Sequence, residues 1–99
     1  MLIHVYQRHI DRGFRGKGCE MLCPIAIAMT EQLGTKFGVW DGKAFVINTG
    51  EYYELPEQAI KTYLRYDRTG LMQAFDFEVG KLQPAKKREV KTEAKTTTA

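Results

Sequence analysis

Both histidines and both cysteines of this 99-residue chain lie between His4 and Cys23. Imidazoles and thiolates are zinc ligands, and four of them can close a tetrahedral structural site. Three residues separate the two cysteines, a spacing that zinc sites use, but the histidines precede the cysteines and are not spaced as in a zinc finger. A zinc-stabilised domain is therefore one alternative, while the leading interpretation is a domain without a cofactor. The ligands of the zinc site in that alternative would be His4, His9, Cys19 and Cys23.

Cys23 also suggests nucleophilic chemistry, because a thiolate at the start of a helix has a lowered pKa. The next residue, Pro24, suits the first position of a helix, which places Cys23 at the helix N-terminus. A cysteine nucleophile needs a base within hydrogen-bond reach and a further group that orients the base. No motif identifies that further group. We therefore expect no enzymatic activity, with Cys23 serving as a small buried apolar side chain.

A glycine-rich basic loop, RGFRGKG, lies between the histidines and Cys23. Cations, flexible backbone and one aromatic ring are a combination that contacts nucleic acid or phosphate. The loop is not a P-loop, because its glycine spacing differs and no hydroxyl residue follows the lysine. An ordinary solvated loop, with the phenylalanine packed in the core, is the alternative. The candidate binding residues of this segment are His9, Arg12, Phe14, Arg15 and Lys17.

Positive charge is concentrated at the two ends of the chain. Residues 1–18 and 82–99 each carry a net charge of +3, whereas residues 19–81 carry −3. Basic arms can meet phosphate groups, so nucleic-acid binding is the first alternative, ahead of the zinc-stabilised domain. The residues that would serve it are Arg8, Arg12, Arg15, Lys17 and the cluster Lys86-Lys87-Arg88.

The last sixteen residues, 84–99, contain no aromatic residue and a single apolar β-branched residue, Val90. Such a segment cannot bury enough apolar surface to offset its ordering entropy, so we expect a disordered basic tail after a single domain at 1–83. No apolar run approaches the roughly 20 residues of a membrane span, and the first residues lack the features of a signal peptide. These observations predict a cytoplasmic protein without a membrane segment.

Hydrophobic periodicity predicts the elements that position these residues, in the order β-α-β-β-β-α-β. Alternating patterns indicate strands at 2–6, 37–40, 44–48, 51–55 and 74–79, with a hairpin turn at Asp41-Gly42. Helical spacing indicates helices at 23–33 and 57–68, and one or two helical turns at 7–12, which Gly13 would end as a left-handed cap. The expected fold is a small α+β domain, with an antiparallel sheet that carries two helices on one face.

Several short motifs together resemble a set of short uncharacterised proteins found in tailed-phage genomes. In that set an H-I-x-x-G step and a cysteine pair with proline precede an alanine-rich helix. The resemblance covers residues 3–79 and implies a phage-encoded protein in the host cytoplasm, without implying an activity. The matching residues are His9-Ile10-Asp11-Arg12-Gly13, Cys19 to Cys23-Pro24, Ala26, Ala28, Leu55-Pro56, Tyr66-Asp67 and Phe75 to Phe77.

These observations together favour a non-enzymatic phage accessory protein that acts as a binding module for a host or phage macromolecule. The binding module is favoured because no complete catalytic or cofactor motif is present, while a basic loop lies beside a buried helix. A protein is the favoured partner. Nucleic-acid binding and a zinc-stabilised domain are the alternatives, and the oligomeric state is left open.

Overall fold

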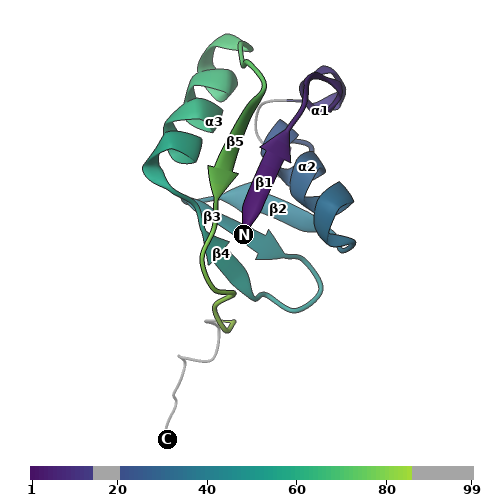
Figure 1. Ribbon diagram of the computed structural model, residues 1–99, viewed down its shortest axis with the longest axis vertical. Coiled ribbons are helices and arrows are strands. Elements are labelled where there is room, and N and C mark those ends of the chain that lie inside the picture. Colours follow the sequence, from purple (N-terminus) through teal and green to yellow (C-terminus); the bar gives the residue numbers. More distant parts are fainter. Residues whose placement is uncertain (15–20, 86–99) are drawn as a thin grey trace, which may run out of the picture.

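The computed structural model describes residues 1–14 and 21–85, which form an α+β domain (Figure 1). The α+β class and the order of the elements are confirmed, and residues 7–12 form a helix of their own. The expected disordered tail lies outside the described residues from Lys86 onward. Within the described ranges, none of the helices is both long and apolar enough to cross a membrane. The elements are β1 (Leu2–Val5), α1 (Gln7–Arg12), α2 (Pro24–Leu33), β2 (Phe37–Trp40), β3 (Lys43–Val46), β4 (Tyr52–Glu54), α3 (Glu57–Thr69) and β5 (Phe75–Glu78).

The strands form two antiparallel sheets, where the sequence suggested one. β1 pairs with β5, with Ile3 opposite Phe77, and β2, β3 and β4 form a separate meander. The physical reason lies at the free edge of β1, where the Gln32 side chain of α2 takes the place of a neighbouring strand. Its Oε1 accepts a hydrogen bond of 3.0 Å from the His4 amide, and its Nε2 donates one of 2.6 Å to the His4 carbonyl.

The turn between β2 and β3 is the two-residue hairpin that Asp41-Gly42 predicts. Both residues have positive φ angles, 55° and 72°, as a type I′ turn requires. The turn is also tied to α3, because the Gly42 amide donates a hydrogen bond of 2.9 Å to the Tyr63 hydroxyl. Local turn chemistry and one tertiary contact therefore hold the meander against α3.

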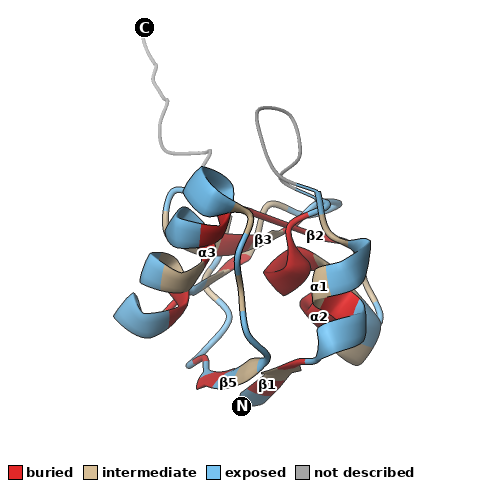
Figure 2. Cartoon of the chain, turned by 90° about the horizontal axis from the view of Figure 1, so that it is seen from above, coloured by how far each residue is buried: buried red, intermediate tan, exposed pale blue. Residues whose placement is uncertain are grey.

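The core is organised around α2, whose residues Ile25, Ala26, Ala28 and Met29 are completely buried. This helix contacts α1, β1 and β2, so it joins the two sheets (Figure 1). Figure 2 shows that α3 buries only one side, whereas most of α2 is enclosed. Outside α2, the buried hydrophobic residues of the described chain are Ile3, Val5, Cys23, Phe37, Val39, Ala44, Val46, Tyr52, Leu55, Ala59, Tyr63, Tyr66, Phe77 and Val79.

Gly13 does not form the left-handed cap that the sequence predicted for α1. Its backbone is extended, with φ −77° and ψ 154°, whereas Gly34 and Gly70 do end their helices with φ 77°. A Cβ atom at Gly13 would lie 2.7 Å from Pro24 Cγ and 3.1 Å from the Tyr66 hydroxyl. The glycine is therefore explained by the close approach of α2 and α3 rather than by its backbone angles.

Candidate functional site

His9 is completely buried. Apart from the tyrosine hydroxyls and the Cys23 thiol, it carries the one buried polar side chain in the described part of the chain. Its Nδ1 accepts a hydrogen bond of 2.9 Å from the Tyr6 amide, which satisfies a free donor at the start of α1. The neutral ring then carries its proton on Nε2, which lies 2.8 Å from Glu31 Oε1 and donates to it. The ring of His9 is enclosed and both of its nitrogens are engaged, and contact of His9 with a partner stays a prediction.

The carboxylate of Glu31 joins α2 to α1. One oxygen accepts the hydrogen bond from His9, and the other accepts a hydrogen bond from Arg8 Nη2. The hydrogen bond from Arg8, followed by the one from His9, lowers the pKa of Glu31, and the hydrogen bond to Glu31 raises the pKa of Arg8. Glu31 is therefore held as a carboxylate whose charge is balanced by Arg8.

Ring contacts extend this network toward β1 and β5. The Arg8 guanidinium lies 4.8 Å from the ring centroid of Tyr6, a cation–π distance, and the Tyr6 and His4 rings stack at 5.6 Å. His4 Nδ1 in turn lies 2.8 Å from Asp76 Oδ1. The Arg8 guanidinium is thus engaged by a carboxylate and a ring, and its part in nucleic-acid binding stays a prediction.

The described zinc candidates do not gather at one point. His4 pairs with Asp76, His9 is engaged by Tyr6 and Glu31, and Cys23 is buried at the N-terminus of α2. In residues 1–14 and 21–85, no group of three His, Cys, Asp or Glu side chains is placed to hold a metal ion. Cys19 lies outside the described residues, so the zinc alternative stays a prediction.

The Cys23 thiol is not activated by its place at a helix start. Burial raises the pKa of Cys23 to about 11, although backbone hydrogen bonds from Ile25 and Ala26 act in the opposite direction. At neutral pH the side chain is a thiol, which is a poor nucleophile. The helix N-terminus therefore fails to produce the low pKa that the sequence suggested, because desolvation is the larger effect.

The raised pKa of Cys23 predicts a loss of stability in alkaline solution. The unfolded chain ionises near the ordinary value of 9.0, and the folded chain only near 11. Stability is therefore full below pH 9 and falls as the pH rises toward 11, by about 1.4 kcal/mol at pH 10. Urea unfolding gives the free energies of unfolding of Cys19→Ala and of Cys19→Ala/Cys23→Ala at pH 8 and pH 10. The difference between the two variants should change by the amount of this loss when the pH is raised from 8 to 10. A difference that stays constant with pH would contradict the burial of this thiol.

A mainly apolar recess of about 340 Å³ lies beside this network, between the end of α1, the start of β2 and α2. Its apolar lining is Met21, Leu22, Ile27 and Phe37. Its polar lining includes Glu31, Arg12 and Lys36. Glu31 thus lines the recess and is also hydrogen-bonded to the buried His9.

One of the predicted binding residues, Arg12, lines this recess. Phe14 lies two residues further along the chain and has 62% of its surface exposed. The alternative with Phe14 in the core is therefore wrong. The Phe14 amide donates a hydrogen bond of 2.8 Å to the Leu22 carbonyl, which joins the basic loop to the residues just before α2. Arg15 and Lys17 belong to that loop and lie outside the described residues.

Glu31 and Gln32 complete the site and were not among the sequence candidates. Both occur near the end of an otherwise apolar helix, and helical spacing placed Gln32 on its buried side. A pair of adjacent polar residues at the end of a buried helix is the signal that could have identified them. Their partners, His9 and His4, lie 22 and 28 residues away in the chain, beyond the reach of local patterns.

Comparison with protein-family models, curated proteins and solved structures found no match for this chain. The resemblance to tailed-phage proteins therefore stays a prediction from the sequence.

Proposed function

We propose that this chain is a non-enzymatic accessory protein that binds a segment of a protein partner in the recess between Arg12 and Lys36. The observation that carries the proposal is the exposed apolar surface at that recess. Met21 and Leu22 line it and expose 40% and 42% of their surfaces, and Phe14, whose amide bonds to the Leu22 carbonyl, exposes 62%. Apolar side chains gathered at a surface recess mark protein-interaction sites. The phage setting is part of the proposal and rests on the sequence resemblance.

The charge around the recess defines the partner. Among the described residues, neither Arg12 nor Lys36 has an ion-pair partner, whereas the Glu31 carboxylate is balanced by Arg8. The rim is therefore net positive, and the neighbouring sequence adds Arg15 and Lys17. Complementary charge guides encounter and suppresses wrong partners. The partner segment should carry one large apolar side chain for the recess, with acidic residues beside it.

The chemistry of the site favours binding over catalysis. The Cys23 thiol is kept protonated by burial, and both nitrogens of His9 are engaged. A cysteine–histidine nucleophile, which needs a thiolate beside an available imidazole, has no support in these positions.

Selection of binders from a random-peptide display library tests the proposal without knowledge of the natural partner. We expect a consensus of one large apolar residue flanked by Asp or Glu. Arg12→Glu should weaken binding of the selected peptides about tenfold, because it reverses a charge at the rim. The matched control is Arg68→Glu on α3, which does not line this recess and should leave affinity within about twofold.

Two outcomes would contradict the proposal. One is a selection that yields no shared apolar–acidic pattern, and the other is equal loss of affinity in Arg12→Glu and Arg68→Glu. If the purified chain instead binds single-stranded nucleic acid with an affinity that falls steeply with salt, the nucleic-acid alternative is favoured.

A further inference from the structure

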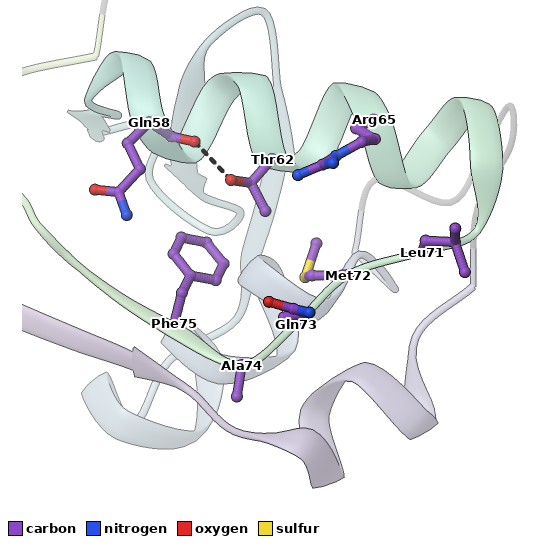
Figure 3. Close-up of a pocket in the computed structure, with 8 residues that line it drawn as sticks. All are labelled: Gln58, Thr62, Arg65, Leu71, Met72, Gln73, Ala74 and Phe75. Atoms are coloured by element: carbon purple, nitrogen blue, oxygen red, sulfur yellow. Dashed lines mark hydrogen bonds between the residues drawn. The ribbon is translucent and has the colours of Figure 1, made fainter.

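A second recess lies between α3 and the segment that leads into β5, and it shares no lining residue with the first (Figure 3). Its volume is about 360 Å³, within the range of sites that hold small organic ligands. Met72 and Phe75 form its apolar side and pack against the hydrophobic core behind them. The recess therefore has a fixed apolar wall on one side and the surface of α3 on the other.

The polar groups of this recess have unused hydrogen-bonding capacity. Its polar lining includes Gln58, Arg65 and Gln73. Within residues 1–14 and 21–85, none of these three side chains forms an ion pair or a hydrogen bond across the recess. Figure 3 shows the Arg65 side chain extending back along α3 toward Thr62, above Met72. Thr62 is less available, because its hydroxyl donates a hydrogen bond of 2.7 Å to the Gln58 carbonyl. The recess thus combines a cation and two amides with an apolar wall.

The charge on α3 next to the recess is positive. Lys61 pairs with Glu57 at 3.2 Å, whereas Arg65 and Arg68 have no carboxylate partner among the described residues. A guanidinium presents paired N–H donors that match the two oxygens of a carboxylate. An anionic group should therefore bind at Arg65, and the rest of the ligand should lie against Met72 and Phe75.

We propose that this recess binds a small carboxylate that carries a flat or branched apolar group. The carboxylate pairs with Arg65, the side-chain amides of Gln58 and Gln73 donate to it or to a neighbouring polar atom, and the apolar group covers Met72 and Phe75. The proposal is independent of the protein-binding recess, because the two sites have no residue in common.

Titration of the full chain with 3-phenylpropionate, followed by amide chemical shifts, tests this site. We expect saturable shifts at Thr62, Met72 and Phe75 in the millimolar range, with smaller shifts at Arg12 and Leu22. Arg65→Gln should weaken binding about tenfold, since it removes the charged partner of the carboxylate. Arg68→Gln, the matched control one turn further along α3, should change it by less than about twofold.

Two further probes separate the charge from the apolar group. The uncharged analogue 3-phenylpropanamide should bind about tenfold more weakly, because it cannot form the charged pair. Inorganic phosphate should also bind more weakly, because it leaves the apolar wall uncovered. Equal binding of acid and amide, equal effects of the two arginine variants, or no saturable shift at Met72 and Phe75 would each overturn the proposal.

Discussion

His9→Ala should lower the free energy of unfolding by about 3 kcal/mol, the largest effect of any single polar residue in this domain. The side chain is completely buried, so its removal leaves a cavity between α1 and α2. It also leaves the Tyr6 amide and one oxygen of Glu31 without the partners that now lie 2.9 and 2.8 Å away. For a domain of this size the melting temperature should fall by roughly 12–24 °C in thermal unfolding followed by circular dichroism.

Two conservative variants divide this effect between the two hydrogen bonds. His9→Asn keeps an acceptor near the position of Nδ1 for the Tyr6 amide, whereas His9→Gln keeps a donor near Nε2 for Glu31. Each should be destabilised by less than His9→Ala. They also remain measurable if His9→Ala does not fold.

The matched control for His9 is His4→Ala. The His4 side chain is 38% exposed and pairs with Asp76 at the surface, where ion pairs contribute little. Its loss should cost less than about 1 kcal/mol. Equal destabilisation by His4→Ala and His9→Ala would contradict the central place of His9 between the helices.

The structure separates what local patterns in the sequence can predict from what they cannot. The alternation of Phe75 and Phe77, the Asp41-Gly42 turn and the glycine at the end of α2 are each decided within a few residues. Their physical causes are the pleat of a strand, the positive φ angles of a type I′ turn and the left-handed helix cap. These elements lie where the sequence predicts them, with ends that differ by one or two residues.

The site depends on distances that no local pattern encodes. The sequence identified His9, Arg12 and Phe14 as candidate binding residues, but it did not predict the burial of His9 and left Phe14 undecided between the core and the surface. The outcome is decided by Glu31 and Gln32, which the packing of α2 brings into contact with α1 and β1. The split into two sheets has the same cause, because Gln32 bonds to the edge of β1.

Gly13 is a second position where tertiary packing overrides a local expectation. Glycine after a short helix usually indicates a left-handed cap, but here the φ angle of −77° is open to every L-residue. In such a conformation a change to alanine normally stabilises a protein by about 0.4–1 kcal/mol, because it restricts the unfolded chain. The sign of the effect at Gly13 is therefore decided by the space around it.

Gly13→Ala should lower the free energy of unfolding by about 2–3 kcal/mol, because the new methyl group overlaps its neighbours. It would lie 2.7 and 2.8 Å from Cγ and Cδ of Pro24, a buried ring at the first position of α2 that cannot rotate away. Gly80→Ala is the matched control, since nothing lies within 4 Å of its added Cβ, and it should be neutral or slightly stabilising. Urea unfolding of both variants measures the contrast. If the two substitutions have the same effect, the close approach of α1, α2 and α3 at Gly13 is contradicted, and with it the packing that holds Arg12 and Phe14 beside the recess.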